Sequence, residues 1–134
     1  MRVVLDTNVV VSALLLDESA SRSAFDRAFE KGGVLLSLPV LAELDEVLAR
    51  PKFRKYVSEE DVRLFLAAYV RKAEWIEIAE SIRACRDPKD DKFLELAASG
   101  HATHIISGDD DLLSLSPFRG IVITPPAAFL RDIK

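Results

Sequence analysis

Short runs of aliphatic and β-branched residues alternate with segments of helical periodicity along this chain, and that alternation limits its possible folds most strongly. The runs predict strands near Arg2–Leu5, Val34–Ser37, Trp75–Ile78, Thr103–Ser107 and Ile121–Ile123. Strands that alternate with helices are typical of domains in which helices cover both faces of a parallel sheet. We therefore expect a three-layer α/β/α domain with a mostly parallel sheet of about five strands.

Several helices between these strands carry their own start and stop signals. The segment Ser19–Lys31 has apolar residues at helical spacing and ends at Gly32-Gly33, while Pro39 opens a helix that Pro51 stops. Ser58–Asp61 resembles a capping box and starts another helix. Further helices are expected in 9–16, 90–99, 109–115 and 125–133. No linker divides the chain, so residues 1–134 are expected to form a single domain.

Charge and cysteine content exclude some classes of protein. Acidic residues outnumber basic ones, 22 to 18, for a net charge of −4, whereas a sequence-independent nucleic-acid-binding module usually carries a basic surface. The single cysteine, Cys85, excludes an intrachain disulfide and a cysteine-rich zinc site. The longest apolar run, Val9–Leu16, is too short to cross a bilayer. Without a signal peptide at the start of the sequence, a cytoplasmic protein without membrane contacts is expected.

Acidic residues collect where the predicted strands end. Asp6 directly follows the first strand, and Asp109 follows the fourth after one glycine. Glu43 lies in the helix after the second strand, on the margin of its apolar stripe, and Asp90 and Asp91 open the helix before the fourth. Ligands of parallel α/β sheets bind beyond the carboxyl ends of the strands. Four segments are therefore expected to bring acid to one edge of the sheet.

Each acid also has a structural explanation. Asp6 can cap a helix, Asp90 and Asp91 can complement a helix dipole, and Asp109 can begin a turn. A single glutamate such as Glu43 is usually a solvated surface residue. Their convergence favours a shared role, because neighbouring carboxylates repel each other unless a cation neutralises them.

The types of side chain in this cluster indicate which cation it would bind. Carboxylate oxygens suit Mg²⁺ or Mn²⁺, and the histidines, His101 and His104, are interpreted as structural residues rather than zinc ligands. Such ions commonly serve phosphoryl transfer, since they polarise the phosphate, lower the pKa of the attacking water and stabilise the leaving oxygen.

Four motifs, in order along nearly the whole chain, resemble those of the PIN-domain nucleases. They are Asp6-Thr7-Asn8, the acid within Leu41–Leu44, the run Arg86–Leu94 with its Asp-Pro-Lys-Asp pattern, and Ser107–Leu113. The similarity is greatest to the bacterial and archaeal subgroup described as toxins of toxin–antitoxin pairs. The resemblance implies a PIN-like fold and Mg²⁺- or Mn²⁺-dependent hydrolysis of RNA, leaving a 3′-hydroxyl and a 5′-phosphate.

The resemblance also implies roles for individual residues. It assigns the four catalytic, metal-binding acids to Asp6, Glu43, Asp90 and Asp109. Asp91 is the alternative third ligand and Asp111 the alternative fourth. The polar residues that would hold the site, through hydrogen bonds to ligands or to metal-bound water, are Thr7, Asn8 and Ser107.

Substrate and partners follow from the same resemblance. An RNA strand would need basic residues near the site, and the segment Arg50–Tyr56 interleaves bases with two aromatic residues. Its candidate RNA-binding residues are Arg50, Lys52, Arg54 and Lys55, although a solvated helix end explains them equally well. A toxin role implies a cognate antitoxin protein and a homodimer.

Two other functions are compatible with parts of this pattern. A receiver-like or phosphatase-like phosphoryl-transfer enzyme would use a nucleophilic aspartate and a lysine after a later strand, but aspartates follow the fourth strand here. A non-catalytic PIN-like module would bind RNA or a protein without cutting. In that case the acids would be dispersed in the structure or paired with arginines.

Overall fold

A computed structural model describes all residues, 1–134. Its centre is a five-stranded sheet in the order β3-β2-β1-β4-β5, and every neighbouring pair of strands is parallel. The strands are β1 (Arg2–Leu5), β2 (Gly33–Leu36), β3 (Glu74–Trp75), β4 (His104–Ile106) and β5 (Val122–Thr124). The predicted α/β architecture and parallel sheet are confirmed.

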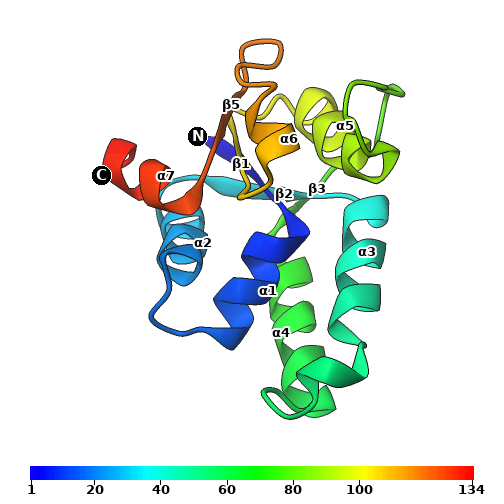
Figure 1. Ribbon diagram of the computed structural model, residues 1–134, viewed down its shortest axis with the longest axis vertical. Helices are drawn as coiled ribbons and strands as arrows, with labels where there is room; N and C mark the ends of the chain where they lie inside the picture. The colour runs from blue at the N-terminus through cyan, green and yellow to red at the C-terminus, as the bar shows by residue number, and fades with distance from the viewer.

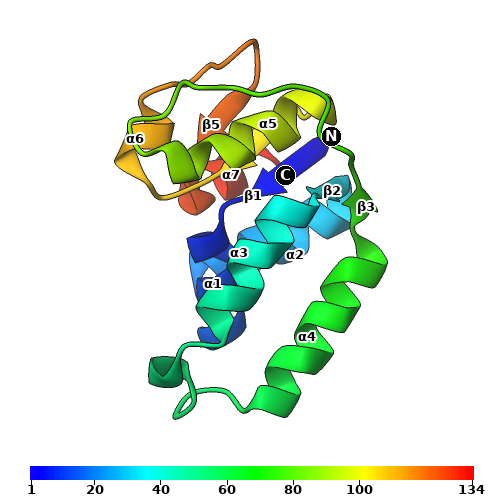
Figure 2. The same cartoon turned by 90° about the vertical axis from the view of Figure 1, so that its right-hand side faces the viewer.

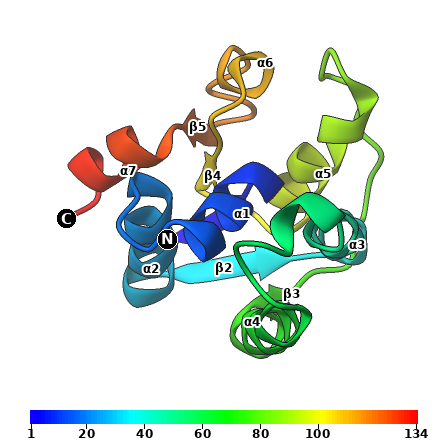
Figure 3. The same cartoon turned by 60° about the horizontal axis from the view of Figure 1, so that its bottom comes forward.

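Helices cover both faces of this sheet. The α-helices are α1 (Thr7–Leu15), α2 (Ala20–Lys31), α3 (Leu38–Leu48), α4 (Glu59–Lys72), α5 (Asp91–Ser99), α6 (Asp110–Leu113) and α7 (Pro126–Asp132); two short 3₁₀ turns are η1 (Pro51–Phe53) and η2 (Pro88–Asp90). Helix α2 packs on β1 and β2 from one side, and α5 packs on the central strands from the other (Figures 1 and 3). None of the helices has the length and hydropathy that a bilayer-crossing segment requires.

Local sequence explains where several elements begin and what they bury. The Ser19 and Ser58 hydroxyls each accept a hydrogen bond from the backbone N–H three residues on, so both serines cap the helices that follow them. The cap at Ser58 was predicted from the sequence. Strand β1 is aliphatic on both faces because it is central, and its residues Val3–Leu5 are buried. Phe93 and Leu94 of α5 are fully buried against it, and each contributes about 2 kcal/mol by leaving water.

The edge strand is shorter than the predicted Trp75–Ile78 and begins one residue earlier. Beyond it the chain runs along α5 as an extended segment, residues 76–87, here called the strap (Figure 2). The Ile76 amide still donates to the Leu36 carbonyl of β2, but farther along the strap the backbone amides donate to side chains of α5. The acceptors are Asp91, Glu95 and Ser99, which lie one helical turn apart on one stripe of α5.

Strand register aligns three polar residues at the carboxyl edge of the sheet. Val3 pairs with Val34, and Leu5 pairs with Ile106. The residues that follow these strands, Ser37, Asp6 and Ser107, therefore continue the same row across β2, β1 and β4. All three are buried. The start of α1 and the helices α3 and α5 surround this edge, so side chains from several elements can reach it (Figure 2).

A candidate carboxylate site at the edge of the sheet

Asp6 is the buried centre of the site. It occupies the N-cap position of α1, but its side chain makes no regular capping hydrogen bond. Its Oδ2 atom instead accepts a hydrogen bond of 2.6 Å from the Ser107 hydroxyl. Burial raises the pKa of Asp6, and the charges of Asp109 and Glu43 raise it further; the Ser107 hydroxyl and the Asn8 amide only partly offset this. Helix capping therefore does not explain the hydrogen bond between Asp6 and Ser107.

Ser107 connects Asp6 to a second acid, Asp109. The Asp109 backbone N–H donates to the Ser107 hydroxyl oxygen at 3.0 Å, and that hydroxyl donates to Asp6. The Asp109 carboxylate in turn accepts from the Asp111 backbone N–H at 2.8 Å, which caps α6. The Ser107 hydroxyl thus has one donor and one acceptor partner among the acidic segments. Its role in supporting a metal site stays a prediction.

Asp90 is the third acid at this edge. It lies at the start of α5 and is half-buried. Burial raises the pKa of Asp90 to about 6, with further contributions from the charges of Asp109 and Asp6, a hydrogen bond with Asp109, and the charge of Asp87. A carboxyl group whose pKa is raised mainly by burial and other carboxylates lacks a compensating cation.

Glu43 approaches from α3. It lies on the margin of the buried face, as its helical position predicts, whereas Glu46 is exposed. The charge of Glu43 raises the pKa of Asp6, so the two acids interact electrostatically. Unlike the other three, Glu43 has a basic partner, because its Oε2 forms an ion pair with Lys92 Nζ of α5. We refer to Asp6, Glu43, Asp90 and Asp109 as the carboxylate cluster.

The two alternative acids have other partners. Asp91 is buried, and its Oδ1 accepts from the backbone amides of Ala84 and Cys85 at 3.1 and 2.7 Å. Burial alone would raise the pKa of Asp91, but these hydrogen bonds outweigh it and leave the pKa below its usual value. Asp111 lies 3.9 Å from Arg86. Among the neighbouring acids, the structure therefore favours Asp90 and Asp109 as members of the cluster.

Two further residues at the site were not predicted from sequence. The Ser37 hydroxyl is fully buried and has no hydrogen-bond partner, although it is level with Asp6. The available signal was its position directly after a strand, the same signal that identified Asp6. Lys92 is the second, and its pairing with Glu43 depends on how α3 packs against α5, which the sequence does not specify. The other two predicted polar residues differ in burial: Thr7 is buried and its hydroxyl has no hydrogen-bond partner, whereas Asn8 is exposed.

The residues of the cluster fit a hard divalent cation. Asp6, Asp90 and Asp109 have no basic group within ion-pair distance, which is 4.0 Å. Two unpaired hydroxyls, on Thr7 and Ser37, add oxygen atoms that lack partners. No three acidic, histidine or cysteine side chains form a compact ligand set in this arrangement. An ion would therefore have to draw the carboxylates together, which their mutual repulsion otherwise opposes.

The predicted RNA-binding segment lies away from the cluster. It includes η1, at the opposite end of the molecule from α5 and α6 (Figures 1 and 2). Arg54 is engaged there in holding the chain, since its guanidinium donates to the carbonyls of Leu48 and Val57. Arg50 lies near Glu46. Lys52 and Lys55 remain exposed, so RNA binding by this segment stays a prediction, with Arg54 as its least suitable member.

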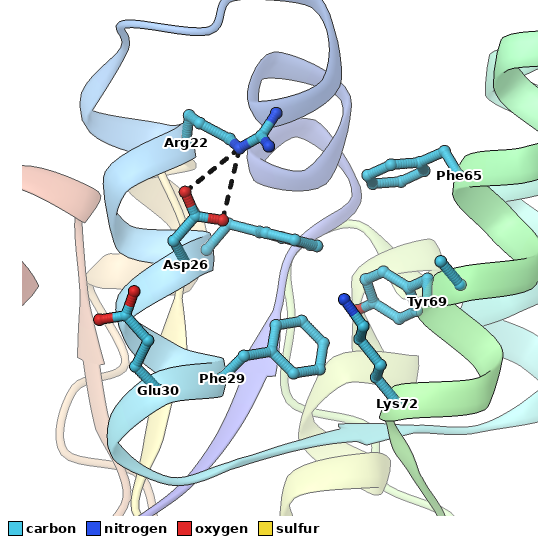
Figure 4. A pocket seen from close by; sticks show the side chains of 9 residues that line it. Arg22, Asp26, Phe29, Glu30, Phe65, Tyr69 and Lys72 are labelled. Carbon is cyan, nitrogen blue, oxygen red and sulfur yellow. Dashed lines mark hydrogen bonds and ion pairs between the residues drawn. The ribbon is translucent and has the colours of Figure 1, made fainter.

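A pocket of about 320 Å³ lies elsewhere, between α2 and α4. Figure 4 shows Phe29 of α2 facing Tyr69 of α4, with Phe65 farther along α4 and the Arg22–Asp26 ion pair on α2. The rings of Phe25 and Tyr69 are 5.7 Å apart, and burial raises the pKa of the Tyr69 hydroxyl. This aromatic contact joins α4 to α2. None of the acids of the carboxylate cluster lines the pocket.

Comparisons with known proteins concern the family and the fold of this chain. The family model for the PIN domain matches residues 2–111. An uncharacterized protein from Methanocaldococcus jannaschii is 35% identical over 117 residues, which are 86% of this chain and 75% of that protein.

Two solved structures are similar in fold. One is a chain in the crystal structure of VapBC2 from Rickettsia felis bound to a DNA fragment from their promoter; its TM-score is 0.63 and its identity 15%, over 92% of this chain and 97% of that one. The other is PAE2754 from Pyrobaculum aerophilum; its TM-score is 0.61 and its identity 14%, over 97% of this chain and 87% of that one. At such identities the similarity concerns the fold alone.

Proposed function

The chain belongs to the PIN domain family, and from this membership we propose that it is a divalent-metal-dependent endoribonuclease acting at the carboxylate cluster. One observation carries the proposal. Three acids of the cluster lack a basic partner, and the pKa values of two of them, Asp6 and Asp90, are raised by burial and by neighbouring carboxylates. Such an arrangement costs folding free energy, which a bound cation would recover.

The residues around the cluster support this chemistry. Mg²⁺ or Mn²⁺ would polarise the phosphate and activate the attacking water. The Ser107 hydroxyl fixes one oxygen of Asp6, so the direction of the carboxylate is set by β1 and β4 together. The Asp109 N–H holds that hydroxyl in place. Asp6, Glu43, Asp90 and Asp109 would thus hold the ion from four different elements, with Ser107 as the orienting residue.

A cleavage assay tests this proposal. Purified protein would be incubated with a mixed pool of single-stranded RNA in Mn²⁺, in Mg²⁺ and in chelator. Asp6→Asn and Asp90→Asn remove a charge with little change of shape, and each is expected to lower the cleavage rate by roughly 100-fold or more. Glu46→Gln is the matched control, because Glu46 is an exposed acid on the same helix as Glu43. Its rate should equal that of the native protein.

The same experiment separates the alternatives. Cleavage that persists in chelator, or in both aspartate variants, would contradict the metal mechanism. If the native protein binds Mn²⁺ and RNA but does not cut, the non-catalytic binding module becomes the better interpretation. A covalent phosphoryl-enzyme on Asp6, detectable by mass spectrometry, would instead favour a phosphatase-like enzyme.

We also propose that the chain is the toxin of a toxin–antitoxin pair. The resemblance of its motifs to the toxin subgroup supports this, as does the fold similarity to a chain of VapBC2. Induced expression in a bacterial host is expected to arrest growth, and the Asp6→Asn variant is expected not to. Growth that is equally slow with both proteins would contradict the toxin role. A homodimer is part of the same proposal, and light scattering of the purified protein tests it.

A further inference from the structure

Lys92 is the only basic group that forms an ion pair within the carboxylate cluster. Its ammonium on α5 contacts Glu43 on α3, 49 residues earlier in the chain. The two side chains are 20% and 27% exposed, whereas every other ion pair in the chain joins side chains at least 36% exposed. Exposed pairs contribute little, because water and salt screen them. The Lys92–Glu43 pair is shielded more than the others, so its charges interact more strongly.

The partner of Lys92 also belongs to the cluster electrostatically. Glu43 raises the pKa of Asp6, which in turn contributes to the raised pKa of Asp90. The Lys92 ammonium, which is paired with Glu43, therefore lies at the margin of a group of four acids. One positive charge cannot neutralise four carboxylates, so the cluster keeps an affinity for a further cation. A cation that binds Glu43 would therefore meet the Lys92 ammonium.

The side chain of lysine suits a counter-ion that can be displaced. Its charge is a compact ammonium on a flexible stem of four carbons, whereas the arginine fork binds a carboxylate with two hydrogen bonds in fixed geometry. Lys92 is also bound by a single contact to Glu43 and makes no other ion pair. Lys92 Nζ also lies 6.0 Å from the centroid of the Phe93 ring, and at that distance a cation–π interaction is weak.

We infer that Lys92 competes with the divalent ion for Glu43, so that the Lys92–Glu43 pair sets the ion concentration at which the site fills. This inference rests on the proposed metal site. In the ion-free protein the pair reduces repulsion within the cluster and joins α3 to α5. When a divalent ion binds, Glu43 exchanges the ammonium for the ion, and the released charge opposes ion binding. Removing that charge should therefore strengthen ion binding.

Mn²⁺ titration of the full chain by calorimetry tests the inference without relying on activity. Lys92→Met keeps most of the side-chain volume and removes the charge, and it is expected to tighten Mn²⁺ binding by about tenfold, the size of effect expected for one partly screened charge a few ångströms away. Lys31→Met removes an equal charge from the end of α2 and should change the affinity by less than about twofold. Lys92→Arg keeps the charge and should not bind more tightly than the native protein.

A double-mutant cycle shows whether the effect acts through Glu43. In a Glu43→Gln background, Lys92→Met is expected to change Mn²⁺ affinity by less than about threefold. Unchanged or weaker Mn²⁺ binding by Lys92→Met in the native background would overturn the inference. So would an equal tightening in the Glu43→Gln background, because it would mean that the charge acts without competing for Glu43. Near-ultraviolet circular dichroism would confirm that each variant is folded.

The titration also separates this inference from the proposed function. If the native protein binds Mn²⁺, Asp6→Asn does not, and Lys92→Met matches the native protein, only the competition is wrong. If neither the native protein nor Lys92→Met binds Mn²⁺, both proposals fall. If both hold, the Mn²⁺ concentration for half-maximal RNA cleavage should fall in Lys92→Met by the same factor as the dissociation constant.

Discussion

Asp90 and Asp91 are neighbours in the chain with opposite electrostatic environments. The pKa of Asp90 is raised to about 6 by burial and by the charges of Asp109 and Asp6. The pKa of Asp91 is lowered because backbone amides of the strap donate to it. Asp90 ends η2 and Asp91 begins α5, and only Asp91 accepts hydrogen bonds from the strap. The ionised form of Asp90 is thus disfavoured, whereas the ionised form of the adjacent Asp91 is stabilised.

The raised pKa of Asp90 predicts how stability depends on pH in the ion-free protein. Between about pH 4 and pH 6 the folded protein binds more protons at this site than the unfolded chain does, so its free energy of unfolding falls as pH rises. Asp90→Asn removes this loss. The variant is expected to match the native Tm near pH 4 and to exceed it by roughly 3 °C at pH 7, measured by thermal unfolding in chelator.

Two results would contradict this expectation. A variant that is less stable than the native protein at pH 7 would mean that ionised Asp90 has a stabilising partner. An equal difference in Tm at every pH would mean that the substitution acts through packing rather than charge. Adding Mn²⁺ to both proteins is the control for a shared site, because the ion should raise the Tm of the native protein more than that of Asp90→Asn.

The sequence predicted most of this site because each acid follows or begins an element whose type is readable. Asp6 and Asp109 follow aliphatic runs, and parallel strands must end at a common edge. The resemblance assigned Asp90 rather than Asp91, but the different environments of the two acids depend on where the strap lies, which the sequence does not show. The unpaired hydroxyl of Ser37 was also missed, because a serine before a helix is most often its cap, and here the side chain makes no capping bond.

At the scale of elements, the α5–strap contact explains why the edge strand was overestimated. Trp75–Ile78 has strand-like composition, but the amides that follow it bond to Glu95, Ser99 and Asp91 of α5. Side-chain acceptors at a spacing of four residues replace the carbonyls of a neighbouring strand. In the sequence this stripe is indistinguishable from an ordinary polar face of a helix, because only the packed structure shows what lies over it.

The turn between α2 and β2 gives a prediction about two adjacent glycines. The sequence predicts that Gly32 and Gly33 both end α2, but the atoms around the two glycines differ. A Cβ atom on Gly32 would lie 2.3 Å from the Met1 carbonyl oxygen, whereas a Cβ on Gly33 would have no atom within 4 Å. Gly32→Ala should therefore force the start of β1 away from the turn and cost about 2–3 kcal/mol of unfolding free energy.

Gly33→Ala is the matched control for that substitution. It adds the same methyl group one residue later, where space is open, and should change stability by less than about 1 kcal/mol. Urea unfolding of the two variants and the native protein gives the comparison. Equal stabilities for the two alanine variants would show that the N-terminal residue moves aside freely. The close approach of Met1 to Gly32 would then have no structural cost.

At the scale of the whole molecule, the sequence alone does not specify the order of the strands in the sheet. Five strands and their parallel direction are readable from the alternation with helices, but their order, β3-β2-β1-β4-β5, is not. This order puts β1 at the centre and makes Asp6 the most enclosed acid of the cluster. The strap and η1, which each carry exposed basic residues, lie at opposite ends of the molecule (Figure 2).

The proposed ribonuclease would have to attract RNA to an acidic chain through local positive charge, and two segments carry such charge. The predicted segment includes the exposed Lys52 and Lys55, near η1. Arg86 on the strap and Lys89 in η2 lie within a few residues of Asp90, and both are exposed. Nearness to the cluster favours the second pair, because the scissile phosphate must reach the carboxylates.

Two matched double variants distinguish these segments, since each removes two positive charges. Arg86→Gln with Lys89→Gln is expected to raise the KM for single-stranded RNA several-fold and to lower the slope of log affinity against log salt by about 1.4, at roughly 0.7 for each phosphate that is no longer neutralised. The Asp111 partner of Arg86, 3.9 Å away, is too exposed for the removal of this ion pair to affect stability much. Lys52→Gln with Lys55→Gln should leave both quantities near those of the native protein. If only Lys52→Gln with Lys55→Gln weakened RNA binding, the RNA would lie along η1. The RNA would then have to extend the length of α3 before it reached Asp6.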